Sequence, residues 1–352
     1  MSNNNPKQKS AFTGRMHGLY HWLYRLLLLS LAYTRSTAGN PTPRGLADKV
    51  TSIYQFPNET WLENIAVRSN DHILTTCFTA PLLYTLDPTA ASPDPVVVAN
   101  FAGKTGVLGI AEIEPDVFAV AAGNVSAPLG EGNYSVSRVD MRSFQASDGE
   151  VIKPADVCVL ADIQDAAVLN GLTLLNSRYL LIADGILGVV FRLDLQTAEY
   201  TIAPNDTTMK PNASAIIQNG INGIHAKDGY LYYTSSGQYL FCRIAVHDNG
   251  TAAGPVEIFN CNLLGDDFIL DQQGNAFITN DPENTLTVRK VDGSTSVVAG
   301  SPNSTVLAGD TACAWSRAPG SRTLYVSTNG GLIEPVNGFV VGGSIVVVDL
   351  CS

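Results

Sequence analysis

The sequence predicts an all-β fold, a six-bladed β-propeller with four antiparallel strands in each blade. Two observations lead to this prediction: a strand–turn–strand unit that recurs at a regular period, and a composition rich in turn-forming residues. Of the 352 residues, 31 are Gly and 18 are Pro, while only 15% are charged. Short apolar runs separated by Gly, Pro, Asn and Asp are typical of antiparallel strands joined by tight turns.

The repeating unit is clearest at residues 265–279. Residues 268–270 form one apolar run, residues 271–275 supply turn formers, and residues 276–279 form a second run. Similar pairs of runs occur at residues 62–76, 107–120, 169–184, 221–234 and 310–328. Most pairs are followed by a third run, as at residues 189–194, 240–245, 286–291 and 345–349, and some by a fourth, as at residues 256–259.

A polar residue stands at the head of five of these units. These residues are Glu63, Asn170, Asn222, Asp266 and Thr311. The gaps between them are 107, 52, 44 and 45 residues, and the pair of runs at 107–120 divides the first gap in two. A four-stranded unit that repeats every ~40–50 residues is the sequence pattern of a propeller blade. We therefore expect six blades within residues 48–352.

A spare strand at residues 50–56 precedes the first unit. The last unit has a third strand at residues 345–349, after which the chain runs only to Ser352. We expect the spare strand to complete the last blade, because this pairing ties the two ends of the propeller together and covers a sheet edge.

Residues 1–47 are predicted to lie outside the propeller, as a signal peptide or signal-anchor followed by a linker. The apolar core at residues 19–33 has the length of a signal-peptide core and is too short for a stable transmembrane span. Ser36-Thr37-Ala38 is a small-residue cleavage site. Because Arg25 interrupts the core, an amphipathic or disordered tail is the alternative. We expect the protein in the secretory pathway or secreted.

Asparagine and cysteine residues fit a secreted glycoprotein. Seven Asn-x-Ser/Thr sequons occur, at Asn58, Asn124, Asn133, Asn205, Asn212, Asn249 and Asn303. The cysteine count of six is even, and Cys242 and Cys261 flank a single turn-rich segment. That placement leaves two alternatives, a disulfide across a hairpin or two separately buried thiols.

Charge and motifs exclude several functions. The net charge is −11 and no cluster of Lys and Arg occurs, so a nucleic-acid partner is not expected. The sequence also lacks a dinucleotide-binding fingerprint, a P-loop, a Gly-x-Ser-x-Gly elbow and a His-Glu-x-x-His motif. Nothing in the sequence indicates the oligomeric state.

The polar residues at the heads of the units are the candidate site. In a propeller the innermost strands all begin at one face of the central channel, so Glu63, Asn170, Asn222, Asp266 and Thr311 are expected to converge there, with Asp267 beside Asp266. Oxygen donors of this kind suit a hard cation such as Ca²⁺. The alternative is that they cap strand ends and hydrogen-bond one another and water. His225 is interpreted as a packed strand residue rather than a base.

These residues resemble those of SMP-30/gluconolactonase-like propellers. In that family a Glu, two Asn-Gly pairs and an Asp hold a divalent metal, typically calcium, and the Asp is taken as the base for lactone hydrolysis. The resemblance implies Glu63, Asn170, Asn222 and Asp266 as ligands. Two departures place larger side chains beside the metal position: Glu63 precedes Asn64-Ile65 instead of Gly-Pro, and Asp266 precedes Asp267-Phe268 instead of Gly.

A closer resemblance is to secreted SMP-30-like propellers of filamentous fungi. It is carried by residues 53–57, 61–68, 222–224, 266–268 and 324–331. Some of these fungal proteins are hetero-Diels–Alderases that join a tropolone quinone methide to a terpene such as humulene. The resemblance therefore implies an enzyme of secondary-metabolite (meroterpenoid) biosynthesis that acts on apolar small molecules.

A cycloaddition needs no cofactor. It needs two partners held in a reactive pose and hydrogen-bond donors on the carbonyl of the electron-poor partner. Asn170, Asn222 and Thr311 are candidate donors, beside the carboxyl groups of the same mouth. The candidate substrate-binding aromatic residues are Trp61, Tyr233, Phe268 and Trp315. Two other hypotheses stand, a Ca²⁺-dependent lactonase or esterase and a non-catalytic secreted propeller that binds a ligand.

Overall fold

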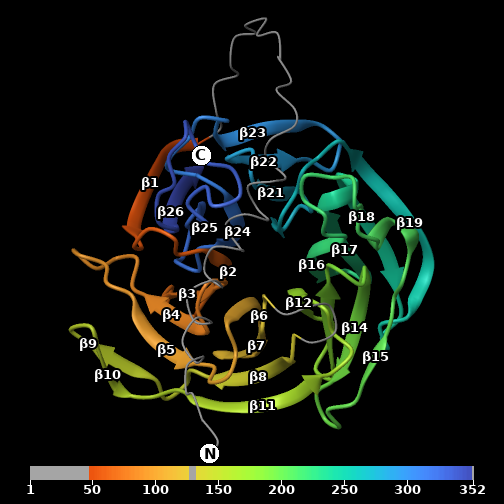
Figure 1. Ribbon diagram of the computed structural model, residues 1–352, viewed down its shortest axis with the longest axis horizontal. Helices are drawn as coiled ribbons and strands as arrows, with labels where there is room; N and C mark the ends of the chain where they lie inside the picture. The colour runs from red at the N-terminus through yellow and green to blue at the C-terminus, as the bar shows by residue number, and fades with distance from the viewer. Residues whose placement is uncertain (1–46, 127–131, 351–352) are drawn as a thin grey trace, which may run out of the picture. The chain divides into compact units, whose positions relative to one another are not determined.

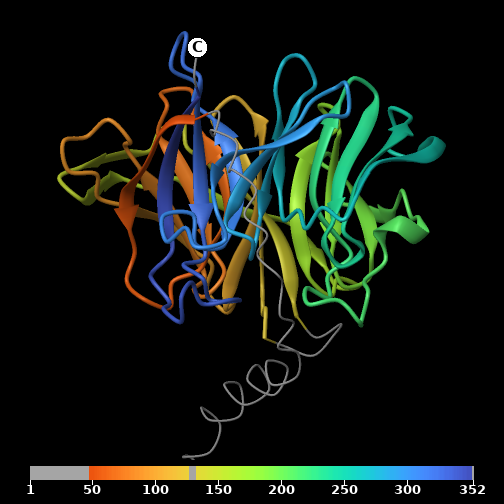
Figure 2. The ribbon, with the colours of Figure 1, turned by 90° about the horizontal axis from the view of Figure 1, so that it is seen from above.

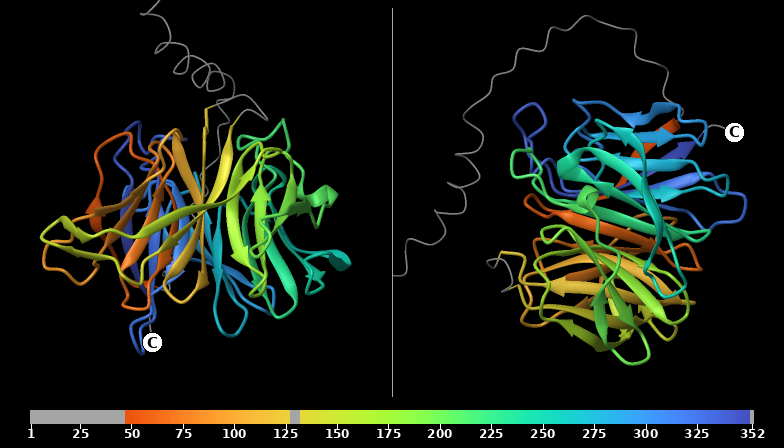
Figure 3. Two further views of the ribbon diagram at one scale, coloured as in Figure 1. Left: turned by 90° about the horizontal axis from the view of Figure 1, so that it is seen from below. Right: turned by 90° about the vertical axis from the view of Figure 1, so that its right-hand side faces the viewer.

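The computed structural model describes residues 47–126 and 132–350, and it confirms the predicted six-bladed β-propeller (Figure 1). Six four-stranded antiparallel sheets stand around a central axis. Side views show that the strands run roughly along this axis (Figure 2, Figure 3). Each blade therefore presents its strand ends on one of two opposite faces.

In blades 1 to 5 the strands follow the chain from the innermost to the outermost position, and in blade 6 the outermost strand is β1. Blade 1 contains β2 (Leu62–Val67), β3 (Ile73–Cys77), β4 (Leu82–Leu86) and β5 (Val96–Asn100); blade 2 contains β6 (Gly106–Glu114), β7 (Val117–Gly123), β8 (Tyr134–Asp140) and β11 (Asp156–Ile163). Blade 3 contains β12 (Leu169–Leu174), β13 (Tyr179–Asp184), β14 (Val189–Asp194) and β15 (Tyr200–Ile202); blade 4 contains β16 (Ile221–Lys227), β17 (Tyr230–Ser235), β18 (Leu240–Val246) and β19 (Ala252–Cys261). Blade 5 contains β20 (Phe268–Leu270), β21 (Ala276–Asn280), β22 (Thr285–Arg289) and β23 (Thr295–Gly300); blade 6 contains β24 (Asp310–Trp315), β25 (Thr323–Thr328), β26 (Ser344–Leu350) and β1 (Ala47–Gln55).

Ring closure follows the prediction. Strand β1 is the outermost strand of blade 6 and pairs antiparallel with β26, with Val50 opposite Val348 and Gln55 opposite Ser344. An exposed hairpin of β9 (Gln145–Ser147) and β10 (Glu150–Lys153), inserted in blade 2, was not predicted. It has no counterpart in the other units, so the repeat gave no signal for it.

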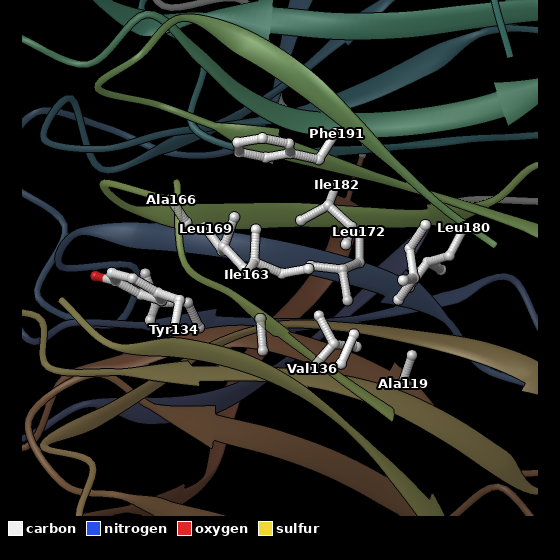
Figure 4. Close-up of a cluster of buried hydrophobic side chains, with 14 of the residues drawn as sticks. Ala119, Tyr134, Val136, Ile163, Ala166, Leu169, Leu172, Leu180, Ile182 and Phe191 are labelled. Atoms are coloured by element: carbon white, nitrogen blue, oxygen red, sulfur yellow. The ribbon is translucent and has the colours of Figure 1, made fainter. Parts of the chain in front are cut away.

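The hydrophobic core lies between neighbouring blades rather than in the channel. Between blades 2 and 3, Tyr134, Val136 and Ile163 face Leu169, Leu172, Ile182 and Phe191 (Figure 4). Strands that are packed on both faces read as continuous apolar runs, as in the fully buried β7. This stacking of blade on blade fixes the position of each innermost strand.

Glycines allow the innermost strands to approach closely at one end. Strands β6, β12 and β16 each have a register irregularity near their start, and Gly109, Gly171 and Gly223 lie within it. A Cβ atom on Gly109 would lie 1.9 Å from the carbonyl oxygen of Asn170, and one on Gly171 would lie 2.5 Å from that of Asn222. Neighbouring backbones are therefore in contact at these positions.

Threonine hydroxyls link successive blades at the same level. Thr234 Oγ1 on β17 lies 3.0 Å from the backbone nitrogen of Gly223, in its own blade, and donates to the carbonyl oxygen of Asp266, in the next blade, at 2.6 Å. Thr76 and Thr279 repeat this arrangement in blades 1 and 5. These bonds hold the strand starts of adjacent blades in register, just where the candidate site lies.

The five cysteines within residues 47–126 and 132–350 are free thiols. Cys242 is buried and pairs in register with Ile258, whereas Cys261 is exposed and lies opposite Leu240. The disulfide alternative is therefore wrong for this pair, since the two residues are not cross-strand neighbours. The other alternative, separate burial, holds for Cys242 alone.

The secretory features are only partly within the described residues. Of the predicted leader and linker, residues 1–47, all but Ala47 lie outside them, and Ala47 is the first residue of β1. Asn58, Asn133, Asn205, Asn249 and Asn303 are exposed, and Asn124 and Asn212 are half-buried. Glycosylation at these sequons stays a prediction. No helix of sufficient length and apolarity to cross a membrane is found in the part of the chain that the structure describes.

Candidate functional site

Four of the predicted polar residues meet at one end of the channel, which we call the mouth. Glu63 Oε1 accepts a hydrogen bond from Asn170 Nδ2 at 3.2 Å, although the two residues belong to blades 1 and 3. Asn222 Nδ2 donates to Asp266 Oδ1 and, at 3.0 Å, to Ser236 Oγ. The mouth thus contains two amide–carboxyl pairs.

The two amides leave their oxygen atoms available. Both amides donate hydrogen bonds through Nδ2. Within residues 47–126 and 132–350, no hydrogen bond is donated to Oδ1 of either residue. Two carboxyl groups and two amide oxygens form a donor set that a hard cation such as Ca²⁺ accepts. Within the same ranges, no three His, Cys, Asp or Glu side chains form a metal-binding group. A cation here would therefore depend on the amide oxygens.

Thr311 does not take part in this cluster. Its hydroxyl donates to the carbonyl oxygen of Leu62 at 2.8 Å and lies 3.0 Å from Ser327 Oγ. The bond to Leu62 joins blade 6 to blade 1, whereas Ser327 belongs to the same blade as Thr311. Thr311 therefore links strands, as the alternative hypothesis proposed, and is not a free donor at the mouth.

Asp267 follows Asp266 in the chain, and its carboxyl group contacts a blade that is not next to its own. Its Oδ2 accepts from Asn64 Nδ2 at 3.0 Å, which joins blades 5 and 1 across blade 6. Its Oδ1 accepts from the backbone nitrogen of Phe268 at 2.7 Å and lies 3.5 Å from His225 Nε2. We infer that the Asn64–Asp267 pair limits the depth of the mouth. Asn64 was missed, although it is an Asn where blades 2 to 4 have Gly.

Only one of the four predicted aromatic residues reaches the mouth. Trp61 Nε1 donates to Glu63 Oε2 at 2.6 Å, and its ring packs on Phe78 with a centroid distance of 4.8 Å. Phe78 was not predicted, because it follows the end of β3 and has no counterpart in the repeat. Trp61 and Phe78 provide an apolar surface beside the Glu63 carboxyl.

The other three aromatic residues lie elsewhere. Phe268 is fully buried between His225 and Phe241, and Tyr233 is fully buried with its hydroxyl 2.6 Å from Thr208 Oγ1. Trp315 is the last residue of β24, whose first residue, Asp310, lies at the mouth end. It therefore lies towards the opposite face. Strand alternation turns Tyr233 and Phe268 into the core.

Two further buried carboxyl groups accompany the mouth. Asp281 Oδ2 accepts from Asn329 Nδ2 at 2.7 Å, and Asp310 Oδ2 accepts from the backbone nitrogen of Asn280 at 3.1 Å. The Oδ1 atom of each is buried and has no hydrogen-bond partner among the described residues. Sequence reasoning missed both, although Asp310 directly precedes Thr311.

Burial, and in part mutual repulsion, raises the pKa values of these carboxyl groups. Burial raises the pKa of Glu63 from 4.5 to about 7, although hydrogen bonds from Trp61 and Asn170 oppose the rise. Burial also raises the pKa of Asp266 well above its usual range, and the negative charges of Glu63 and Asp281 add to the effect. The pKa values of Asp281 and Asp310 are likewise raised, chiefly by burial. The environment of the mouth therefore favours the neutral, proton-bearing form of these acids over the ionised form.

We expect the free energy of unfolding to fall as the pH rises between about 5 and 8. A carboxyl whose pKa is raised by folding stabilises the native state below its ordinary pKa, and this contribution is lost as the pH rises through the folded-state value. For Glu63, a rise from 4.5 to about 7 corresponds to roughly 3 kcal/mol. Thermal unfolding followed by circular dichroism across this range measures the loss.

Asp310→Asn is expected to flatten this profile and to raise Tm at the alkaline end. The amide oxygen can still accept from Asn280, and no charge has to be buried. Asp292→Asn is the matched control, since Asp292 is exposed and its pKa is lowered by a hydrogen bond from Ser294. If Tm fell with rising pH as steeply in Asp310→Asn as in the wild type, Asp310 would not be a buried acid with a raised pKa.

Comparisons with known proteins agree with the sequence and the fold. No protein-family model matches the chain. The chain is 25% identical over 336 residues to a Phoma sp. protein named "Putative hetero-Diels-Alderase", and the match covers 87% of this chain and 95% of that protein.

Solved structures show the same propeller. A luciferin-regenerating enzyme superposes with a TM-score of 0.61 at 13% identity, over 86% of this chain and 95% of the other. Regucalcin, a calcium-binding protein from Agrobacterium tumefaciens, superposes with a TM-score of 0.56 at 15% identity, over 85% and 94%. At these identities the likeness shows the fold alone. The chain is thus similar in sequence to a protein named for hetero-Diels–Alder chemistry and similar in fold to regucalcin-like propellers, which confirms the resemblance that its sequence predicted.

Proposed function

We propose that this protein catalyses a cycloaddition of the hetero-Diels–Alder type in natural-product biosynthesis. The observation that carries the proposal is the Glu63 carboxyl, which has a pKa raised to about 7 and is oriented at the mouth by the N–H groups of Trp61 and Asn170. When it holds its proton, this group can donate a hydrogen bond to a substrate carbonyl. The similarity to the Phoma sp. protein over 87% of the chain supports the same reaction class.

The reaction places few chemical demands on a protein. An oxygen-containing diene and an alkene combine; one C–C and one C–O bond form, three π bonds become one, and no atom leaves. Holding the two partners in a reactive pose can supply several kcal/mol of the barrier. A preorganised donor at the diene oxygen stabilises the charge that develops there in the transition state.

The substrates implied by the resemblance are a tropolone quinone methide and a humulene-type terpene. We assign the protonated Glu63 carboxyl to the quinone-methide carbonyl, because it is a neutral donor beside an apolar surface. Trp61 and Phe78 are assigned to the terpene, which has no group to hydrogen-bond. Asp266, paired with Asn222, is a second neutral acid at the same mouth.

The direct test is turnover. The purified protein is incubated with a quinone-methide precursor and humulene, and the stereoisomers of the adduct are separated by chiral chromatography. We expect faster formation and one dominant stereoisomer relative to the protein-free mixture. Glu199→Ala, at an exposed glutamate of the β14–β15 turn, is the control and should behave as the wild type. A product ratio equal to that of the uncatalysed mixture contradicts the proposal.

The donor set of the mouth favours one second candidate, a Ca²⁺-dependent lactonase or esterase. Glu63, Asp266 and the free amide oxygens of Asn170 and Asn222 would hold the ion. Bound calcium would polarise a lactone carbonyl. Asp266 would have to be ionised to act as the base, whereas burial raises its pKa and so opposes that ionisation.

Chelation and Asp266→Asn separate the two candidates. We expect cycloaddition to survive EDTA, and Asp266→Asn to slow it by less than about tenfold, because the amide is still a neutral donor. Hydrolysis would be lost in both cases. Activity that disappears with EDTA and returns with Ca²⁺ would favour the lactonase, and no turnover or stereochemical bias with either substrate class would favour a non-catalytic ligand-binding propeller.

A further inference from the structure

The face opposite the mouth carries a hollow of about 790 Å³ between blades 5 and 6. It is lined by the turn after β20, by the ends of β22, β24 and β26, and by the turn between β24 and β25. Its volume is in the range of roughly 300–1,000 Å³ that small-molecule sites occupy. None of the mouth residues lines it, so it is separate from the proposed active site.

Apolar side chains form the floor of the hollow, and Trp315 is the largest of them. The indole N–H of Trp315 donates to the carbonyl oxygen of Leu270 at 3.2 Å, and its ring packs edge-to-face on Phe277 with a centroid distance of 5.0 Å. Val288 and Leu350 add aliphatic surface. Trp315 is half-buried although its polar atom is satisfied, so part of a fixed aromatic surface is open to a ligand.

The rim of the hollow carries two cations and one carboxylate, in a protein whose net charge is −11. Lys290 and Arg322 both line it and are exposed. In the described ranges, no hydrogen bond or ion pair involves the Lys290 ammonium or the Arg322 guanidinium. Asp271 also lines the hollow, but its carboxylate already accepts from the backbone and side-chain nitrogens of Asn275 at 2.8 and 2.7 Å. The rim therefore offers two cations without a direct ion pair in the described ranges, above an apolar floor, although Asp292 lies near enough to Lys290 for the Lys290 charge to add to the hydrogen bonds from Ser294 that lower the Asp292 pKa.

We propose that this hollow is a second ligand site, which binds an amphipathic organic anion with an aromatic or aliphatic body and one carboxylate. The body packs on Trp315, and the carboxylate lies between Lys290 and Arg322. Arg is suited to this task because its planar guanidinium matches the geometry of a carboxylate. The site is independent of the proposed cycloaddition, since the two faces share no lining residue.

The test uses 2-naphthoate and its neutral analogue 2-naphthamide, titrated into the full chain by isothermal titration calorimetry. We expect saturable 1:1 binding of naphthoate and at least tenfold weaker binding of the amide. Arg322→Ala and Lys290→Ala should each weaken naphthoate binding about tenfold or more. The matched controls Arg142→Ala and Lys153→Ala remove the same charges at exposed positions outside the hollow and should leave the affinity unchanged.

Two further variants locate the ligand. Trp315→Ala should abolish naphthoate binding, and, because this change can also disturb blade 6, the exposed Lys290 and Arg322 variants keep the test decisive. Glu63→Ala, at the mouth, should bind naphthoate as the wild type does. Equal affinity for the acid and the amide, or an equal loss in Arg142→Ala and Arg322→Ala, would overturn the proposal. Loss of naphthoate binding in Glu63→Ala would also overturn it, by placing the ligand at the mouth.

Discussion

Glu63→Ala is expected to lower the rate of cycloaddition by about 10²–10³-fold, the cost of removing one preorganised donor from the oxygen that gains charge in a transition state. The substitution also leaves the N–H groups of Trp61 and Asn170 without their acceptor. Initial rates of adduct formation at saturating substrate measure the effect. A rate unchanged from the wild type would remove Glu63 from the mechanism.

The same residue predicts the pH dependence of the rate. Since the Glu63 pKa is about 7, the wild-type rate should fall as the pH rises through that value and the donor proton is lost. Glu63→Gln keeps a neutral N–H donor of similar size, so its rate should lie between those of the wild type and Glu63→Ala. Its profile should be flat over the same range. A rate that rises through pH 7 would instead indicate that the ionised carboxylate acts as a base.

Gly223→Ala is expected to destabilise the propeller by about 3 kcal/mol or more, at the upper end of the overpacking range. The added Cβ would lie 2.1 Å from Asp267 Oδ1 and 2.6 Å from Asp267 Cα, so part of the clash is with backbone that cannot turn away. Relieving the clash would move the Asp267 side chain and break its bond to Asn64. Thermal unfolding should show a Tm lower by roughly 5 °C.

Gly254→Ala is the control for backbone effects. Gly254 lies in the exposed strand β19, and the nearest atom to a Cβ there is Ala245 Cβ at 3.7 Å. We expect its stability to change by less than about 0.5 kcal/mol. If Gly223→Ala were as stable as Gly254→Ala, the close contact between blades 4 and 5 would be wrong.

The repeat predicted the fold and the location of the mouth, but not the direction of every side chain. Glu63, Asn170, Asn222 and Asp266 come together because the period of the blades places them at equivalent strand starts. Trp315 stands in the same innermost-strand segment as Thr311, yet four residues of extended strand span ~13 Å, which carries it to the opposite face.

Contacts between distant blades left no periodic signal. The Asn64–Asp267 bond joins residues 203 positions apart, and it forms because two blades depart from the Gly that others have at that level. Asp281 follows the end of β21 and therefore returns to the mouth through the second strand of its blade. Residues of this kind can be predicted only when the end of the second strand in each blade is known, because that end determines which residue returns to the mouth.

The pairing of β1 with β26 has a consequence for biosynthesis. Strand β1 precedes every other described strand in the chain, and β26 follows all of them, so the strand that leaves the ribosome first must wait for the one that leaves last. Blades 1 to 5 can assemble before β26 is made, whereas blade 6 is completed only when β26 pairs with β1. Until then β1 has an unpaired edge, and an edge of this kind can pair with other chains, so the open ring is the stage of folding most exposed to aggregation.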